Sequence, residues 1–341
     1  MNPLAPDLPW ALVQFVLAAA VIAHAGTRLS GICDRLADRT GLGEAFTGAV
    51  LLGAATSLPG IAASVTAALD GLPTLALANA IGGIAAQTAF LAIADIAYRR
   101  ANLEHAAASV PNMMQAALLI VLLATMLAAM HAPPVTLGGV HPVSPTLLLV
   151  YGFGMAMVYR SREYPMWQPR MTGSTRLDRP QEPRGGRPLR ALWAGFVASA
   201  VLVILAGILV TRSGEAIAAQ TGLSRTLVGA LFVAIATSLP ELVTSVAAVR
   251  RGALTLAVGG VVGGNAFDTL FAAVADIAYR PGSLYHGATP REGFLIALTI
   301  VMTGVLLLGL LRRERLGIAR IGFESFFVLL LYAFAIAVIA R

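Results

Sequence analysis

Two carboxylates, Glu241 and Asp268, interrupt long apolar runs in the second half of the chain. A charged side chain at membrane depth is costly unless it is paired, protonated or bound to a cation, so each is a functional candidate. Thr237 precedes Glu241 by four residues and Asn265 precedes Asp268 by three, and these spacings place each pair on one helix face. Carboxylate, hydroxyl and amide oxygens together suit hard cations such as Ca²⁺ or Na⁺.

Pro240 stands directly before Glu241. Because proline has no backbone N–H, a carbonyl one turn earlier loses its helical donor and is free to turn toward a cation. The run that contains Asp268 is rich in glycine, and small residues let membrane helices approach closely. The sequence therefore predicts a kinked helix packed closely against a glycine-rich one, with both carboxylates at their contact.

The polar motif occurs twice in the chain. Thr56-Ser57-Leu58-Pro59-Gly60 returns 181 positions later as Thr237-Ser238-Leu239-Pro240-Glu241, and Asp95-Ile96-Ala97-Tyr98-Arg99 returns at the same offset as Asp276-Ile277-Ala278-Tyr279-Arg280. A duplicated polar motif within apolar halves is typical of secondary transporters, whose site lies where the halves meet. The second copy carries Glu241 where the first has Gly60.

The composition indicates a membrane protein that crosses the bilayer several times. Of 341 residues, 57% are hydrophobic and 12% are charged, whereas soluble domains carry about 25% charged residues. Apolar runs of about 20 residues recur along the chain. The formal charge of +7 fits arginines in loops that set topology, so we expect no nucleic-acid partner. A single cysteine, Cys33, excludes an internal disulfide and a multi-cysteine metal site.

We predict an all-α integral membrane protein with ten transmembrane helices in two inverted five-helix repeats. The repeats are residues 1–159 and 192–341, and they are joined by an Arg/Pro-rich linker over residues 160–191. The predicted spans are 8–27, 44–69, 73–96, 110–131, 143–159, 192–213, 225–249, 254–277, 291–311 and 322–340.

Arginine placement predicts the orientation. With the linker in the cytoplasm, 19 arginines fall on the cytoplasmic side and 5 on the other, as the positive-inside rule requires. Both termini then lie outside. Five spans per half is an odd number, so the second half enters the membrane in the opposite sense. We expect the protein in a bacterial inner membrane, with the lipid bilayer and small cations as partners; the sequence leaves the oligomeric state open.

The second copy of the motif resembles a known family. Ala236-Thr237-Ser238-Leu239-Pro240-Glu241, followed by Gly263-Gly264-Asn265-Ala266-Phe267-Asp268, is similar to the second alpha-repeat of the sodium/calcium exchanger (cation/calcium antiporter) family. The resemblance implies a plan of five plus five helices and transport of Ca²⁺, Na⁺ or H⁺, with no cofactor. It also implies ion ligands at Thr237, Ser238, Glu241 and Asp268.

The first copy departs from the family pattern. Thr56 and Ser57 are kept, but the family glutamate falls on Gly60, the Ser-Asn pair falls on Gly83-Ile84, and the final acid or amide falls on Gln87. Two strong carboxylates remain where the family usually has three, which we expect to weaken divalent binding. Exchange of Ca²⁺ against Na⁺ is the function we predict. H⁺-coupled exchange and a non-transporting homologue that acts as an ion sensor or scaffold are the alternatives. An enzyme is not expected, because no nucleophile or histidine constellation is visible.

The candidate metal ligands form one set of eight residues. They are Glu241, Asp268, Thr237, Ser238, Thr56, Ser57, Gln87 and Asn265. For Gln87, an ion ligand and an interhelical hydrogen bond are equally open, and for Asn79 packing is the expected role.

Four further polar residues are expected outside the site. Asp95 and Asp276 each precede an arginine, Arg99 or Arg280, by four residues near a helix end, which predicts interfacial salt bridges. His141, on an outer loop with prolines, is expected to be solvated, as is His131.

Overall fold

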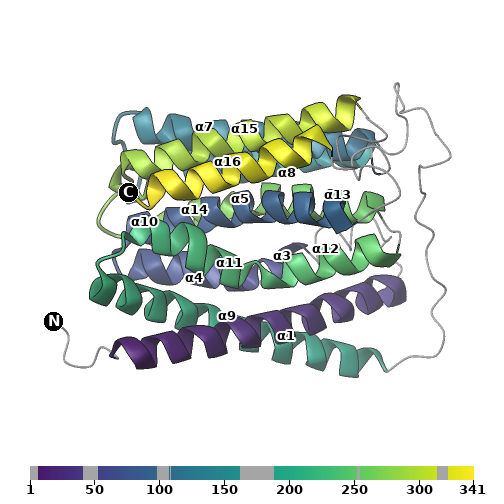
Figure 1. Cartoon of the computed structure of the whole chain (residues 1–341), viewed down its shortest axis with the longest axis horizontal. Helices are drawn as coiled ribbons and strands as arrows, with labels where there is room; N and C mark the ends of the chain where they lie inside the picture. Colours follow the sequence, from purple (N-terminus) through teal and green to yellow (C-terminus); the bar gives the residue numbers. More distant parts are fainter. Residues whose placement is uncertain are drawn as a thin grey trace.

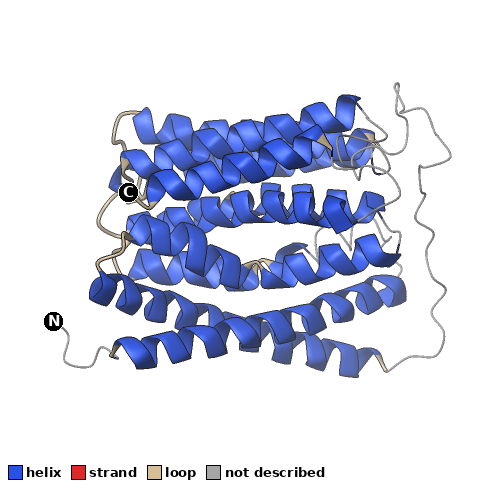
Figure 2. Ribbon diagram, in the orientation of Figure 1, coloured by secondary structure: helices blue, strands red, loops and turns tan. Residues whose placement is uncertain are grey.

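The computed structural model describes residues 7–40, 53–97, 107, 109–161, 188–251, 254–312 and 322–341. Within these residues the secondary structure is helical apart from loops and one isolated bridge between Leu137 and Val140 (Figure 2). Most of the predicted linker and the first part of the predicted span 44–69 lie outside the described residues.

The helices follow the same order in both halves of the chain. In the first half they are α1 (Leu8–Thr40), α3 (Gly53–Thr56), α4 (Leu58–Leu69), α5 (Pro73–Ala97), α7 (Val110–His131) and α8 (Val143–Arg160). In the second half they are α9 (Leu189–Thr221), α10 (Arg225–Leu227), the π-helix η2 (Val228–Val233), α11 (Ala234–Thr237), α12 (Leu239–Arg251), α13 (Leu254–Asp268), α14 (Leu270–Ala278), the short 3₁₀ helix η3 (Tyr285–Gly287), α15 (Pro290–Arg312) and α16 (Phe323–Ile339).

Length and composition suit several of these helices to a bilayer. Among the described residues, six helices are long and apolar enough to cross a membrane, and the bent pair Arg225–Thr237 and Leu239–Val246 makes a seventh. Leu58–Leu69 and Phe323–Ile339 are shorter apolar helices. Large apolar side chains such as Leu149, 74% exposed, cover the outer faces, as expected where lipid is the solvent. The prediction of an all-α membrane protein is therefore confirmed.

The helices form three groups (Figure 1). α1 and α9 pack along each other at one edge, and α7, α8, α15 and α16 lie at the opposite edge. Between these edges lie α4, α5 and α11 to α14. The apolar stretch of α5 is 94% buried inside the protein, which makes α5 the central helix, since a helix that is apolar on all sides is stable only when fully surrounded.

Helices break near their middles in the central group. Ser57 separates α3 from α4, Ser238 separates α11 from α12, and Thr269 separates α13 from α14. The first two breaks precede Pro59 and Pro240, whose missing N–H removes a helical hydrogen bond at that turn. The second break bends its helix pair by 47°. The proline in each motif copy thus ends one helix and begins the next.

The two halves interlock at these breaks. Gly26 of α1 lies against the ring of Pro240, and Gly207 of α9 lies against the Pro59 backbone, where a Cβ atom on Gly207 would come within 2.6 Å of the Pro59 carbonyl oxygen. Positions 26 and 207 differ by the same offset as the two prolines. The first helix of each half therefore packs on the break of the other half, and the duplication extends to the packing.

The predicted salt bridge between Asp276 and Arg280 is wrong. Asp276 is buried, and its carboxylate accepts hydrogen bonds from His141 N at 2.8 Å, Ser144 Oγ at 2.7 Å and Leu284 N at 2.7 Å. The carboxylate turns inward to the start of α8, where neutral donors satisfy it, rather than toward a solvated arginine.

Asp95 makes the equivalent contacts in the other half. It accepts hydrogen bonds from Ser325 Oγ at 2.8 Å and Gly322 N at 3.3 Å, at the start of α16. Ser325 is the repeat counterpart of Ser144, and Gly322 that of His141. Arg99 lies outside the described residues. Each aspartate therefore holds the first turn of the last helix of the opposite half, by the same pair of donors.

His141 is buried, in contrast to the expectation of a solvated loop residue, while His131 is exposed as expected. The centroid of the His141 ring lies 5.3 Å from that of the His286 ring and 5.5 Å from that of the Tyr285 ring. Its Nδ1 accepts a hydrogen bond from Val143 N at 3.2 Å. The reason is the inward turn of Asp276, which draws the His141 backbone into the protein.

Acidification is expected to destabilise the protein through His141, which lies in the loop between α7 and α8. Burial lowers its pKa, and the neighbouring His286 lowers it further. Because the folded state disfavours the charged ring, its stabilising contribution is present above the unfolded pKa of about 6.5 and is lost as the pH falls below it. We expect the drop in Tm between about pH 7.5 and about pH 5.5 to shrink in His141→Gln. An unchanged drop would contradict this assignment.

Gly207→Ala is expected to destabilise the protein, because the added methyl group must push α9 away from the Pro59 carbonyl. Overpacking of this kind costs about 1–3 kcal/mol, which a lower Tm in detergent would register. Gly152→Ala in α8 is the matched control, since a Cβ atom there meets nothing within 4 Å. Equal Tm values for the two variants would contradict close packing at Gly207.

Candidate cation site at the helix breaks

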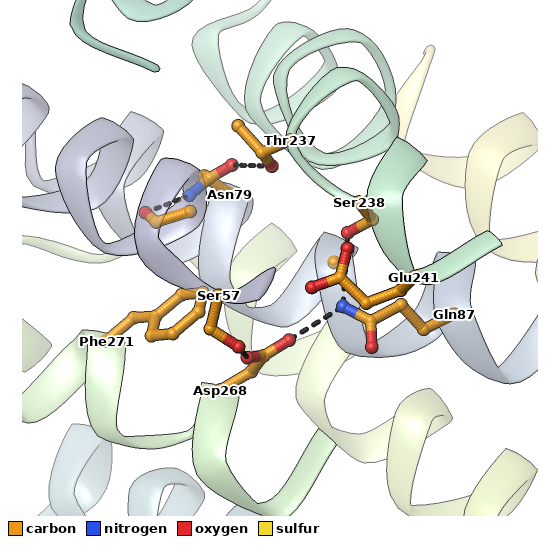
Figure 3. Close-up of a pocket in the computed structure, with 10 residues that line it drawn as sticks. Ser57, Asn79, Gln87, Thr237, Ser238, Glu241, Asp268 and Phe271 are labelled. Atoms are coloured by element: carbon orange, nitrogen blue, oxygen red, sulfur yellow. Dashed lines mark hydrogen bonds between the residues drawn. The ribbon is translucent and has the colours of Figure 1, made fainter. Parts of the chain in front are cut away.

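A small enclosed pocket lies where the broken helices meet α5 (Figure 3). The cavity volume of the pocket is about 10 Å³, which is close to the minimum needed to hold one water molecule. The pocket is therefore about the size of a single water molecule. Its lining residues are Ser57, Gly60, Asn79, Gly83, Gln87, Thr237, Ser238, Glu241, Asp268 and Phe271.

Asp268 is the last residue of α13 and is 1% exposed. Ser57 Oγ donates to its Oδ1 at 2.6 Å, and Gln87 Nε2 donates to its Oδ2 at 2.7 Å. Both donors come from the first half of the chain (Figure 3). The carboxylate is thus fixed by the opposite half, and charge-assisted hydrogen bonds of this length are strong ones.

Gln87 makes an interhelical hydrogen bond, one of the two roles that the sequence leaves open for it. Its Nε2 also donates to Ser238 Oγ at 3.1 Å, so the amide links α5 to the break between α11 and α12. Its Oε1 is buried and has no hydrogen-bond partner among the described residues. Such an oxygen is costly to bury unless a ligand approaches it.

Glu241 lies in the first turn of α12. The Thr56 side chain hydrogen-bonds to it, whereas its Oε2 is buried without a partner in the described part of the chain. In Figure 3 its carboxylate lies beside Ser238 and Gln87. An unpartnered carboxylate oxygen and an unpartnered amide oxygen therefore share one small pocket.

No arginine neutralises these carboxylates within the described residues. The two ion pairs found there join Arg212 to Asp70 and Arg225 to Glu215, and both are solvent-accessible. Asp268 is buried, and Glu241 is half-buried with its Oε2 out of contact with solvent. Two such carboxylates at membrane depth without a positive side chain need a cation or a proton. The donor set of carboxylate, amide and hydroxyl oxygens fits a hard cation.

Asn79 lines the pocket, although packing is its expected role. Its Nδ2 donates to the Gly60 carbonyl at 3.1 Å and to Ser64 Oγ at 2.8 Å, and its Oδ1 lies 3.3 Å from Thr237 Oγ1. Its repeat counterpart is Gly260, so comparison of the two copies gives no signal for it.

The structure brings six of the eight predicted ligands to the pocket wall. Thr56 is buried beside the pocket and reaches Glu241 without lining the cavity. Asn265 turns to α5 instead, where its Nδ2 donates to Thr88 Oγ1 at 3.0 Å. The six that line the pocket are Glu241, Asp268, Thr237, Ser238, Ser57 and Gln87.

This combination of helix breaks and buried oxygens defines a class: multi-pass membrane proteins with a polar site enclosed among discontinuous helices. The model of the family "Sodium/calcium exchanger protein" matches residues 10–160 and 191–340. The chain therefore belongs to the sodium/calcium exchanger protein family, whose members are exchangers rather than enzymes.

Individual relatives agree with this membership. Inner membrane protein YrbG of Escherichia coli (strain K12) is 30% identical over 122 residues, which are 36% of this chain and 37% of that protein. The fold is similar to that of the sodium-calcium exchanger NCX_Mj soaked with zero Na⁺ and Ca²⁺, with a TM-score of 0.60 and 19% identity over 96% of this chain and 98% of that one. It is also similar to the H⁺/Ca²⁺ exchanger CAX, with a TM-score of 0.65 and 16% identity over 97% and 84%.

Gln87→Leu is expected to weaken Ca²⁺ binding about tenfold, since it removes one pocket oxygen and a donor that fixes Asp268, a loss of about 1.4 kcal/mol. Isothermal titration of purified protein in detergent measures the change. Thr125→Val is the control, because Thr125 is exposed on α7 and bonds only to its own helix, at the Val121 carbonyl. Equal affinities in the Gln87 variant and wild type would exclude Gln87 from the site.

Proposed function

We propose that the chain is a secondary active antiporter that exchanges Ca²⁺ against Na⁺ at the pocket between Glu241 and Asp268. One observation carries this proposal: the buried Asp268 and the half-buried Glu241 share a pocket with unpartnered oxygens and without an arginine among the described residues. Thr56, Ser57, Thr237, Ser238 and Gln87 add hydroxyl and amide oxygens or orient the carboxylates. Asn265, also a predicted ligand, lies outside the pocket lining and joins α13 to α5 through its hydrogen bond to Thr88.

Coupling follows from the cost of moving bare charge. The empty pocket would carry two negative charges at membrane depth, which is unfavourable by several kcal/mol. A bound Ca²⁺ neutralises the pair, and so do two monovalent cations. Only the loaded forms then cross between the inward-facing and outward-facing states, so transport of one ion requires return with the other.

Alternating access uses the interlocked halves. The ten predicted spans form two inverted repeats with the linker in the cytoplasm and both termini outside, in agreement with the 19-to-5 distribution of arginines. α1 and α9 pack on each other and on the two proline breaks. Movement of this pair across the breaks would expose the pocket to one side at a time. We place the protein in a bacterial inner membrane.

H⁺-coupled exchange is the second candidate. Gly60 leaves the first copy of the motif without a carboxylate, so fewer monovalent cations can be held, and a buried carboxylate accepts a proton more readily than an exposed one. The structural neighbour CAX is an H⁺/Ca²⁺ exchanger. A non-transporting ion sensor remains the third candidate, with the altered first motif as its supporting feature.

The test is uptake of ⁴⁵Ca²⁺ into proteoliposomes under an imposed Na⁺ gradient and, separately, under a pH gradient. We expect uptake driven by Na⁺ in the wild type and its loss in Glu241→Gln and in Asp268→Asn, because each variant removes half of the site's charge. Asp70→Asn is the control, since Asp70 is an accessible carboxylate outside the pocket and surface ion pairs contribute little.

The outcomes separate the candidates. Uptake driven by pH alone would establish proton coupling at the same site. Ca²⁺ binding without uptake under either gradient would favour the ion sensor. Full uptake in both pocket variants would contradict the proposed site.

A further inference from the structure

The pocket contains a side chain at the position where the repeat would place a third carboxylate. Gly60 is the counterpart of Glu241. A Cβ atom built on Gly60 would lie 2.5 Å from Cε2 and 3.1 Å from Cζ of Phe271. Contacts below 3.0 Å are not sustained without movement of one partner. The edge of the Phe271 ring thus occupies the first part of the path that any side chain at position 60 would take.

The helix break after Asp268 brings this ring to Gly60. Thr269 separates α13 from α14, and α14 packs against α4, which carries Gly60. Phe271 lies three residues beyond Asp268, is 4% exposed, and lines the same pocket (Figure 3). Its repeat counterpart, Phe90, lies in α5, which is continuous from Pro73 to Ala97. Only one half of the chain therefore has this break, and the aromatic ring follows from it.

We propose that Phe271 determines how much positive charge the site carries: its ring fills the position of a third carboxylate and limits the pocket to Glu241 and Asp268. The ring also keeps water from the side of the pocket at Gly60. Position 60 itself supplies no side-chain oxygen there. The proposal rests on the proposed transport function for its charge count but not for the contact itself.

Charge balance then sets the exchange ratio. Two carboxylates are neutralised by one divalent cation or by two monovalent cations, so the loaded site is neutral in both directions. Exchange moves no net charge across the membrane. A site with three carboxylates would be neutralised by three monovalent cations but would keep one negative charge with one divalent cation, so exchange between these two loaded forms would move one net charge per cycle.

The contact is tested by a stability cycle that needs no transport. Gly60→Ala is expected to lower the Tm of the wild type by several degrees. In a chain that already carries Phe271→Ala, the same substitution is expected to cause no further loss, since the methyl group then enters the space of the ring. Phe90→Ala is the matched control and should not relieve Gly60→Ala. Additive effects of Gly60→Ala and Phe271→Ala would overturn the contact.

The charge count is tested by the voltage dependence of exchange in proteoliposomes clamped with valinomycin. One net charge per cycle would shift the equilibrium Ca²⁺ ratio about 50-fold for about 100 mV, the equivalent of one elementary charge in that field. We expect no shift in the wild type and a shift toward that size in Gly60→Glu/Phe271→Ala. A wild-type shift near 50-fold would overturn the proposal.

Failure of the inference and failure of the proposed function give different results. A wild type that transports no cation contradicts the function, while the stability cycle still decides whether the ring occupies the space at Gly60. A wild type that transports with voltage dependence leaves the function intact and rejects the charge count. If the double variant does not fold, the wild-type voltage measurement and the alanine cycle still decide.

Discussion

The placement of two carboxylates, the buried Asp268 and the half-buried Glu241, without a neutralising arginine in the described structure is the constraint around which the centre of this protein is organised. Each carboxylate is held by groups from the opposite half or the opposite motif: Asp268 by Ser57 and Gln87, and Glu241 by Thr56. These contacts orient the oxygens but supply no positive charge. The remaining electrostatic cost is what a transported cation would offset, and that cost makes binding and movement depend on each other.

The helix breaks make this arrangement possible. A continuous helix would bond its backbone groups internally and present only side chains to the pocket, whereas Pro59 and Pro240 interrupt the ladder beside the hydroxyls of both motifs. The same breaks receive α1 and α9 through Gly26 and Gly207. The candidate ion ligands and the packing of these two helices therefore share the same few turns, so a change at one would affect the other without a long-range pathway.

Much of this arrangement could be predicted from the sequence. The duplicated motif lies within apolar runs, which places it at membrane depth, and the spacing of its polar residues puts them on one helix face. The family membership and the all-α membrane fold are confirmed, and Pro240 predicted one of the three breaks. The proximity of Ser57 and Gln87 to Asp268 followed from the expectation that the halves meet at the motifs. Whether these residues bind a transported ion stays a prediction.

The rest depends on contacts that no motif encodes. Asp276 turned to neutral donors because the start of α8 lies closer than solvent, and this contact also buried His141. Asn79 and Phe271 reach the pocket from positions whose repeat counterparts, Gly260 and Phe90, have no equivalent role in it. The break at Thr269 could not be predicted in this way, because no proline lies beside it. The differences between the two copies could therefore be found only from the structure.

The most direct test of the central claim is anomalous diffraction from crystals of the protein soaked in Sr²⁺, a heavier cation with the same charge as Ca²⁺. If Glu241 and Asp268 bind the transported cation, we expect one strong peak between their carboxylates, beside Gln87, and its loss in crystals of Glu241→Gln. A peak elsewhere in the protein, or one that persists in the variant, would contradict the claim that these two carboxylates bind the transported cation.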